Sequence, residues 1–394
     1  MYAGICLINI KKHTRSILEA EMTELHQKTI NAFPGYKYVT ALESDDHKPH
    51  NMYRGVDVGF GGYVYANPGI YYNVTCFDVS GMHPASAIAL GCFGEYTEKY
   101  KEIVDIRQAI KHKEFDRARA MMGGALAEHL TDASKAKELS NALKIAVNSV
   151  YGLTSASFDN PFRDPRNLNN IVALRGALFM KTLQDELESK GITVVHIKTD
   201  SIKVVDPTPE ISQFIFDFGH KYGYNFEIEH VFDRICLVND AVYIAKLAED
   251  DPDNPGKWTA TGTQFQVPYV FKTLFSKEPI EFKDMCETKS VKSAMYLDFS
   301  EDLPEGDHNY QFIGKVGLFC PMVSGCGAGY LLRENETTGK FGAVTGTKGY
   351  LWMEADEVKI RGLEDKIDRG YYKTLVDEAV DTISQFGDFE AFTA

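Results

Sequence analysis

The chain has 394 residues, of which 44% are hydrophobic and 25% charged, a composition typical of a soluble globular protein large enough for two or three subdomains. No apolar run approaches the length of a membrane span, the N-terminus lacks the order of a signal peptide, and the seven cysteines form no CxxC pair. These features argue against a membrane partner, a disulfide scaffold and a zinc ribbon, and they predict a cytoplasmic protein.

The net charge of -14 is distributed unevenly along the chain. Residues 247–394 carry 15 basic and 26 acidic side chains, whereas residues 1–246 carry 27 basic and 30 acidic ones. The larger part is therefore close to neutral. Overall charge neither supports nor excludes a nucleic-acid partner, because such a partner needs basic side chains that converge on one groove.

The first 67 residues predict a helix, a linker and a glycine-rich segment. A helix is expected over 17–33, and the polar tract LESDDHKPH that follows is typical of a linker. Residues 53–67 interleave glycine and tyrosine and include Gly61, Gly62 and Tyr63. Glycine allows close approach of the backbone to a partner, although a plain turn between strands has the same composition.

Residues 69–90 predict a strand followed by a helix. The β-rich run over 71–77 ends at Asp78, and Pro84 opens the helical segment. An aspartate between a strand end and a helix start is a good metal ligand. It is equally a good N-terminal cap of the helix.

Two charged helices follow from Glu95 to about residue 150, and they predict an antiparallel helical hairpin with a break at Gly123 and Gly124. On the first helix, Arg107 and Lys111 are four residues apart and share a face.

On the second helix, Lys144, Asn148 and Tyr151 form one stripe of a cation, an amide and an aromatic ring. Such a stripe suits a bound nucleoside triphosphate, and an ordinary solvated face is the alternative.

The next hundred residues predict an α+β sheet of the ferredoxin-like kind. A helix over 164–190 precedes two β-branched runs, 192–197 and 202–205, which flank a four-residue polar apex that contains Asp200. A helix over 210–222 and strands over 225–229 and 241–247 complete the pattern. A carboxylate at such an apex suits Mg²⁺, although aspartate is also an ordinary turn residue.

The C-terminal third begins with the run EDDPDNPGK, which is typical of a linker. Short strands with glycine-rich turns and a helical tail over 363–386 are expected after it. Lys315, Arg333 and Lys348 are candidates for contacts with phosphate, and solvated surface side chains are the alternative.

Three segments, FDVSGMHP, KIAVNSVYG and KTDS, resemble in order and spacing three sequence blocks of the family B (polymerase α-like) DNA polymerases, DxxSLYPSI, KxxxNSxYG and DTDS. The middle block matches at every defined position. IVDIRQAIK resembles the first finger helix of that family, FGGYV its glycine-tyrosine element, and VNDAVYIAK its segment after the palm hairpin. The resemblance covers about residues 55–250 well and the C-terminal third loosely.

For the fold, this resemblance implies an α+β protein with a ferredoxin-like palm built on an antiparallel sheet, helical-hairpin fingers and a thumb-like α+β C-terminal region. The expected division is an N-terminal segment and linker (1–50), the two parts of the palm (51–95 and 151–248), the fingers (96–150), and the thumb with the C-terminal region (249–394).

For the chemistry, the resemblance implies a template-directed DNA polymerase core that adds dNTPs to a primer 3'-hydroxyl by a two-metal mechanism. Asp78, Asp200 and the carbonyl of Val79 would hold two Mg²⁺ ions, with Mn²⁺ as a substitute. Lys144 would be the third catalytic residue, protonating the leaving group. The nucleotide would be bound by Arg107, Lys111, Lys144, Asn148, Tyr151 and His83, and the primer-template DNA by Gly61, Gly62, Tyr63, Tyr243, Lys315 and Lys348.

The sequence departs from the family pattern in three places. Lys198 stands where the family has the first aspartate of DTDS, which adds a cation near the metals. Gly81 and His83 replace a serine and the tyrosine that excludes ribose. Asn239 and Asp240 stand where basic residues touch the primer-template.

Only 77 residues precede Asp78, and they contain no DxE motif of a proofreading exonuclease. A separate exonuclease polypeptide is therefore an expected partner, and a viral or phage source would suit such a compact enzyme, acting in the cytoplasm of a host cell. Two alternatives stay open. One is a catalytically inactive, polymerase-like DNA-binding or scaffold subunit, and the other is a primase-like transferase.

Overall fold

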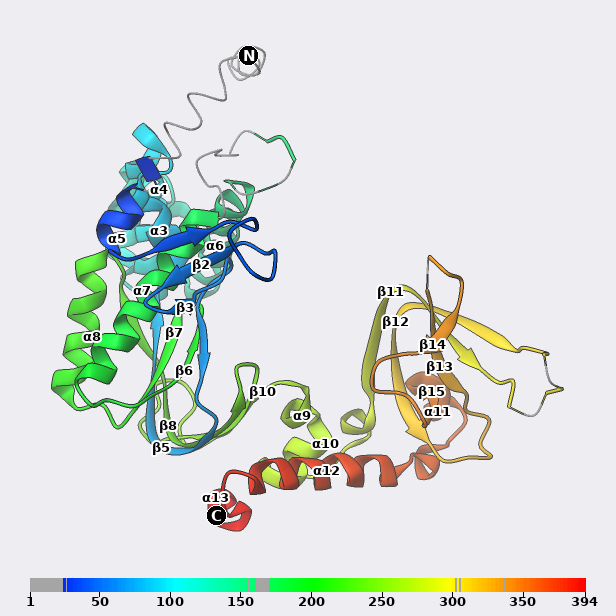
Figure 1. Cartoon of the computed structure of the whole chain (residues 1–394). Helices are drawn as coiled ribbons and strands as arrows, with labels where there is room; N and C mark the ends of the chain where they lie inside the picture. Colours follow the sequence, from blue (N-terminus) through cyan, green and yellow to red (C-terminus); the bar gives the residue numbers. More distant parts are fainter. Residues whose placement is uncertain are drawn as a thin grey trace. The chain divides into compact units, whose positions relative to one another are not determined.

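The computed structural model describes residues 24–394 apart from 26, 155, 157, 161–169, 302, 305 and 336. The chain forms two compact units, one that takes in the residues up to Asn67 together with Tyr72–Phe232, and one made of Pro68–Tyr71 and Asp233–Ala394. Both units combine helices with antiparallel sheets, which confirms the predicted α+β class (Figure 1). Among the described helices, none is both long enough and apolar enough to cross a membrane.

The main sheet of the first unit has the ferredoxin-like strand order that the sequence predicts. Its strands lie in the order β8-β5-β7-β6, and β4 extends the sheet beyond β6. The pairs β5 with β7, β6 with β7 and β4 with β6 are antiparallel. The strands are β4 (Val64–Ala66), β5 (Gly69–Val79), β6 (Val194–Lys198), β7 (Ser201–Val205) and β8 (Phe226–Asn239).

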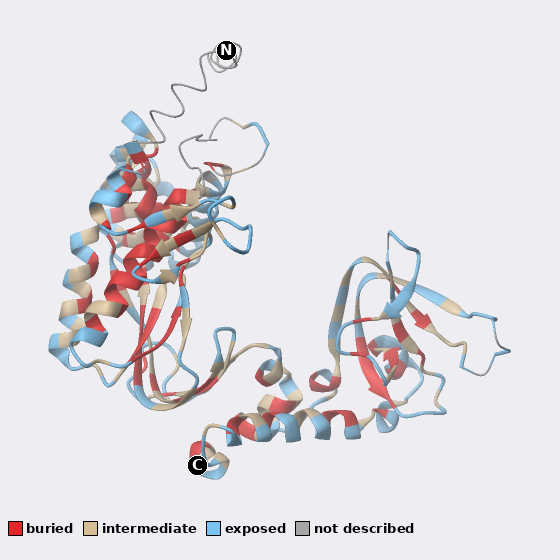
Figure 2. Cartoon of the chain, in the orientation of Figure 1, coloured by how far each residue is buried: buried red, intermediate tan, exposed pale blue. Residues whose placement is uncertain are grey.

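Helices cover one face of this sheet, and the longest of them is almost entirely buried (Figure 2). These helices are α3 (Met82–Leu90), α7 (Ile171–Ser189) and α8 (Pro209–Tyr222). Phe77 and Ile202, which are register partners on β5 and β7, pack into one core with apolar side chains of α3, α7 and α8. Full burial of each such side chain contributes roughly 1.5–3 kcal/mol. At Gly176 a Cβ atom would lie 2.5 Å from the sulfur of Met82, so glycine is what lets α3 approach α7.

The alternation along β5 separates the core from the opposite, polar face. Phe77 and Val79 belong to the hydrophobic core, and Cys76 and Asp78, which alternate with them along the strand, point to the other side. The strands β6, β7 and β8 present polar side chains to the same side. On this side of the sheet Asp78 is half-buried, whereas Cys76, His196 and Lys203 are buried.

A second helical layer corresponds to the predicted hairpin. It consists of α4 (Thr97–Lys111), α5 (Phe115–Ala120) and α6 (Ala133–Thr154). The helices α4 and α6 pack against each other around a small core that includes Ile106, Ile110 and Leu130. The predicted break lies between them, where Met122 and Gly123 have positive φ angles.

The N-terminal segment ends in a three-stranded antiparallel sheet. Its strands are β1 (Lys37–Val39), β2 (His50–Tyr53) and β3 (Val56–Asp57). The tract predicted as a linker is the loop that joins β1 to β2. The tract is irregular, as predicted, but it connects two strands of one sheet and not two subdomains. Residues 27–32 are helical as predicted, and residues 1–23 of the N-terminal segment lie outside the described part.

The second unit contains a five-stranded antiparallel sheet in the order β14-β13-β11-β12-β15. Its strands are β11 (Glu287–Asp298), β12 (Tyr310–Met322), β13 (Tyr330–Glu334), β14 (Phe341–Ala343) and β15 (Leu351–Glu354). Trp352 is fully buried in its core, with Tyr372 of the long C-terminal helix. The helices of this unit are α9 (Thr263–Gln266), α10 (Pro268–Phe271), α11 (Ala355–Ile360), α12 (Arg369–Ser384) and α13 (Phe389–Thr393).

A hairpin replaces the second predicted linker. Strands β9 (Val242–Leu247) and β10 (Trp258–Thr261) pair with Trp258 opposite Lys246, and the acidic run EDDPDNPGK closes the loop between them. A hairpin loop and a linker have the same polar composition, so the sequence alone did not separate them. The predicted helical tail is confirmed as α12, which Asp368 caps by accepting the backbone N–H groups of Gly370 and Tyr371.

Candidate active site

The fold brings Asp78 and Asp200 to neighbouring positions on the polar face. Asp78 lies opposite Ser201 in the β5–β7 register, and the N–H of Val79 donates to the carbonyl of Asp200 over 2.8 Å. The helix α3 has Gly81 at its N-terminal cap without a side-chain bond, so the capping role for Asp78 is wrong. The structure thus joins two acids that are far apart in the sequence.

These two acids repel each other and are poorly solvated. Burial, together with the charges of Asp200 and Glu229, raises the pKa of Asp78 to about 7. Burial also raises the pKa of Asp200, with Glu229 adding to the shift and the backbone N–H of Asp200 and the charge of His83 opposing it. A site that holds two carboxylates in this way is suited to a cation that offsets their charge.

The turn that carries Asp200 is tighter than predicted. Strand β6 ends at Lys198 and β7 begins at Ser201, so two residues form the loop instead of four. Thr199 has a positive φ of 57°, and the N–H of Asp200 donates to the carbonyl of Lys198 over 2.7 Å. This backbone conformation fixes the direction of the Asp200 side chain.

The glycine-tyrosine segment contacts the turn that carries Asp200. The N–H of Thr199 donates to the carbonyl of Tyr63, and a Cβ atom on Gly62, whose φ is 146°, would lie 2.8 Å from the Thr199 side chain. Tyr63 is buried and its hydroxyl donates to Gln184 over 2.8 Å, so its side chain packs into the core, and a contact of Tyr63 with DNA stays a prediction. Gly61 is exposed. Contacts of Gly61 and Gly62 with DNA stay a prediction.

Two further acids on β8, which the sequence reasoning missed, complete the acidic face. Glu227 and Glu229 are two residues apart on β8, the strand next to β5, so their side chains lie on the same face. The Cys76 thiol of β5 donates to Glu229 over 3.6 Å. The alternation of NFEIEH was the available signal, because residues two apart on a strand share a face. To place these two glutamates beside Asp78, one must also know that β8 lies next to β5, which the sequence alone does not show.

The donor set at this face fits a hard divalent cation. Asp78 and Asp200 offer carboxylate oxygens, and Mg²⁺ is commonly held by one or two carboxylates while water and substrate phosphates fill its other positions. No group of three acidic, histidine or cysteine side chains is preassembled for a metal among the residues that the structure describes. The carbonyl of buried Val79 as a ligand stays a prediction.

His83 and Tyr151 form a stacked pair between α3 and α6. Their ring centroids are 4.5 Å apart and the rings are 16° from parallel. The Tyr151 hydroxyl donates to Asn170 over 2.9 Å, and the Asn170 amide donates to the carbonyl of Phe60 over 3.0 Å. Burial lowers the pKa of His83, and its Nδ1 has no hydrogen-bond partner in the described part of the chain. The charge of Asp200 acts on His83, which places the stack beside the acid pair.

Lys144 and Asn148 lie on the exposed side of α6. They line a shallow hollow with Asn141, Ile145 and Ser149. Tyr151 belongs to the same helical stripe but is half-buried. The predicted stripe therefore exists, with two polar members free for a ligand and the aromatic member packed against His83.

Arg107 and Lys111 share a face of α4, as predicted, but a carboxylate already engages one of them. Lys111 forms an ion pair with Glu227, and His112 lies 2.9 Å from the same carboxylate. Arg107 is half-buried, and its Nε has no hydrogen-bond partner within the described residues. These contacts tie the end of α4 to strand β8.

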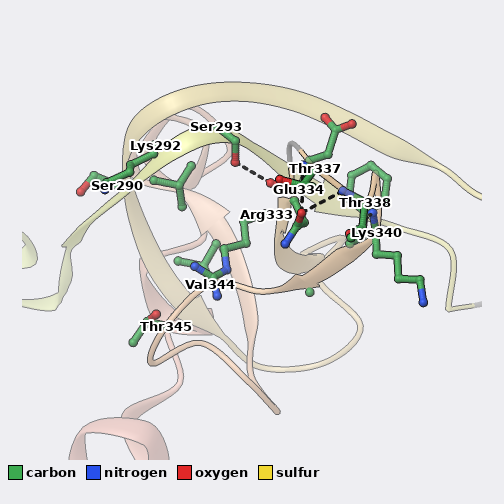
Figure 3. A pocket seen from close by; sticks show the side chains of 14 residues that line it. Ser290, Lys292, Ser293, Arg333, Glu334, Thr337, Thr338, Lys340, Val344 and Thr345 are labelled. Atoms are coloured by element: carbon green, nitrogen blue, oxygen red, sulfur yellow. Dashed lines mark hydrogen bonds between the residues drawn. The ribbon is translucent and has the colours of Figure 1, made fainter. Parts of the chain in front are cut away.

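The remaining predicted DNA contacts belong to the second unit. Tyr243 lies on β9 opposite Thr261, and Lys315 and Lys348 are exposed. The same unit has a hollow of about 790 Å³ between β11, β13 and β14, with Lys292, Arg333 and Lys340 around its rim (Figure 3). The polar residues that line it are Ser290, Lys292, Ser293, Arg333, Glu334, Asn335, Thr337, Thr338, Lys340 and Thr345.

No protein-family model and no curated protein matches the chain. Among solved structures, the chain is similar to the family B DNA polymerase from the hyperthermophilic archaeon Pyrobaculum calidifontis, with 12% sequence identity and a TM-score of 0.43. The alignment covers 90% of this chain and 47% of that polymerase, so the chain spans about half of its length. This likeness is distant.

Proposed function

We propose that the chain is the catalytic core of a template-directed DNA polymerase, which adds dNTPs to a primer 3'-hydroxyl. The observation that carries the proposal is the placement of Asp78 beside Asp200 on the polar face of the main sheet. Two half-buried carboxylates with raised pKa values are a costly arrangement unless the function requires them. Phosphoryl transfer from a triphosphate is a reaction that uses such a pair.

Each group of the site has a role in this proposal. Divalent ions, Mg²⁺ or Mn²⁺, would be held by Asp78 and Asp200 and would supply Lewis acidity at the transferred phosphoryl group. Exposed Lys144 would bind the triphosphate and give a proton to the leaving pyrophosphate. The stack of His83 on Tyr151 would form one wall of the pocket for the sugar and base, with Asn148 nearby on α6.

The arrangement of the elements gives the proposed division of labour. The sheet with its acid pair would be the palm, the layer of α4 and α6 the fingers, and the second unit the thumb. Arg107 and Lys111 on α4 would neutralise the triphosphate. Tyr243, Lys315 and Lys348 of the second unit would contact primer-template DNA. The separate exonuclease partner and the viral or phage source stay predictions of the sequence.

Primer extension tests the proposal directly. Wild type with Mg²⁺, a primed template and dNTPs should extend the primer. Asp200→Asn, which keeps the size of the side chain and removes its charge, should reduce the rate by at least about 10³-fold, because metal coordination contributes several kcal/mol to the transition state. Asp105→Asn is a matched control, since Asp105 is an exposed partner of Lys101 on α4. Extension by Asp200→Asn at the wild-type rate would refute the assignment.

A catalytically inactive DNA-binding subunit is the second candidate. The last residue before the turn, Lys198, is exposed and sits two residues from Asp200, where it adds a positive charge to the neighbourhood of the acid pair. This reading expects primer-template binding without extension by the wild type. Lys198→Asp separates the two candidates, because a dead enzyme disabled by this cation would gain activity when the cation is replaced by an acid.

A further inference from the structure

The carboxylate of Glu227 contacts three side chains, two of them at the C-terminal end of α4. Glu227 pairs with Lys111, lies 2.9 Å from the imidazole of His112, and accepts the hydroxyl hydrogen bond of Ser80. Burial alone would raise the pKa of Glu227, but the hydrogen bonds from Lys111, Ser80 and His112 lower it below its usual value. Glu227, on β8, therefore holds two side chains at the C-terminal end of α4 and the hydroxyl of Ser80.

A third basic side chain, Arg107, lies near the same carboxylate. Arg107 lies one helical turn before Lys111, and its Nε lacks a hydrogen-bond partner in the described residues. Burial lowers the pKa of Arg107, and the charge of Glu227 opposes that shift. The C-terminal part of α4 thus presents three basic side chains to one acid, with hydrogen-bonding capacity left over for another anion.

The pair of Lys111 and Glu227 also lies next to the proposed reaction centre. Both charges act on the carboxyl of Asp78, Lys111 lowering its pKa and Glu227 raising it. A triphosphate bound between α4 and the acid pair would need the same basic side chains that Glu227 now engages. The protein carboxylate and the substrate would therefore compete for one set of donors.

We propose that Glu227 occupies the triphosphate position of α4 in the substrate-free molecule and is displaced when the nucleotide binds. This inference rests on the proposed function. Glu227 acts as an internal competitor: it holds Lys111 and His112 ready, keeps them from binding other phosphates, and lowers the affinity for the triphosphate. It is a positioning residue that sets nucleotide affinity and does not touch the reacting atoms.

A passive brace is the alternative role for the same contacts. If Glu227 only tied α4 to β8, its removal would loosen Lys111 and weaken the binding of any polyphosphate. If Glu227 competes with the ligand, its removal frees the cations and strengthens the binding. The two roles therefore predict opposite signs for one measured quantity.

The test measures the binding of inorganic tripolyphosphate to the full chain in the presence of Mg²⁺ by isothermal titration calorimetry. Glu227→Gln should bind tripolyphosphate on the order of tenfold more tightly than wild type, because a charged hydrogen bond no longer has to be broken. Glu227→Asp keeps the charge but draws it back from Lys111, so it should give a smaller gain. Lys111→Met should weaken binding in both the wild-type and the Glu227→Gln backgrounds, and Asp105→Asn should match wild type.

If Glu227→Gln folds and binds tripolyphosphate no more tightly than wild type, the inference is overturned. If Glu227→Gln does not fold, the same result for Glu227→Asp overturns it. Primer extension by the same variants separates this outcome from failure of the proposed function. A wild type that extends no primer but shows the tenfold gain in Glu227→Gln would refute the polymerase and keep the competition. If the wild type extends primers but the nucleotide KM of Glu227→Gln does not fall, the polymerase assignment stands and the competition by Glu227 is refuted.

Discussion

Asp78 and Asp200 are held side by side by their backbones while their charges push them apart. The N–H of Val79 donates to the carbonyl of Asp200 over 2.8 Å, and Ser201 faces Asp78 across the same pair of strands. Burial and the nearby acids raise the pKa of Asp78 from 3.8 to about 7. The folded protein therefore bears a cost at neutral pH that the unfolded chain does not.

This cost predicts that removing a catalytic acid stabilises the protein. The unfolded carboxyl ionises near pH 4 and the folded one only near pH 7, so stability from Asp78 is lost as the pH rises between these values. Asp78→Asn should raise the free energy of unfolding by about 1–2 kcal/mol at pH 8 after allowance for solvent screening, and by much less at pH 4. Thermal unfolding in EDTA at the two pH values measures this. A fall in the melting temperature of Asp78→Asn at pH 8 would contradict it.

Divalent cations should relieve the same repulsion. Mg²⁺ or Mn²⁺ at ten times its dissociation constant should stabilise wild type by about 1.4 kcal/mol, because only the folded chain assembles the two carboxylates. The gain in melting temperature should disappear in the double variant Asp78→Asn with Asp200→Asn, and it should persist in Asp105→Asn. An equal gain in the double variant would place the cation elsewhere.

The sequence predicted much of this arrangement because its strongest signals are local. The β-branched runs on either side of Asp200 and the strand that ends at Asp78 follow from residue type and alternation, and both strands are present. Glu227 and Glu229 were missed because their role depends on β8 lying next to β5, a pairing between segments far apart in the chain.

Other differences between prediction and structure arise where one local sequence pattern is compatible with two different structures. The acidic run after β9 has the composition of a linker but closes a hairpin, since Lys246 pairs with Trp258 across it. The ring of Tyr63 has the look of an exposed stacking surface but fills the core beside Gln184. Burial of a tyrosine depends on what packs above it, which local composition does not contain.

The glycines beside the turn offer a matched pair of variants. Gly62→Ala places a Cβ atom 2.8 Å from Thr199 at a φ of 146°, whereas Gly61→Ala meets nothing within 4 Å. We expect Gly62→Ala to lose about 1–3 kcal/mol of stability and to displace Asp200, reducing primer extension strongly. Gly61→Ala should change the stability by little. Chemical denaturation and extension rates measure the two effects, and equal behaviour of the two variants would show that Gly62 does not support the turn.

The hydroxyl of Tyr151 links the stacked ring to the start of α7, because it donates to Asn170 at the N-terminal cap of that helix. Tyr151→Phe keeps the stack on His83 and leaves a half-buried Asn170 oxygen without this donor, which should cost about 1 kcal/mol of stability. If the stack is the wall of the nucleotide pocket, a ring that Asn170 no longer holds in position should also raise the KM for dNTPs severalfold while kcat changes less. Tyr96→Phe is the control, since Tyr96 is 61% exposed. A loss of stability with an unchanged KM would confine Tyr151 to a structural role and move the pocket wall elsewhere.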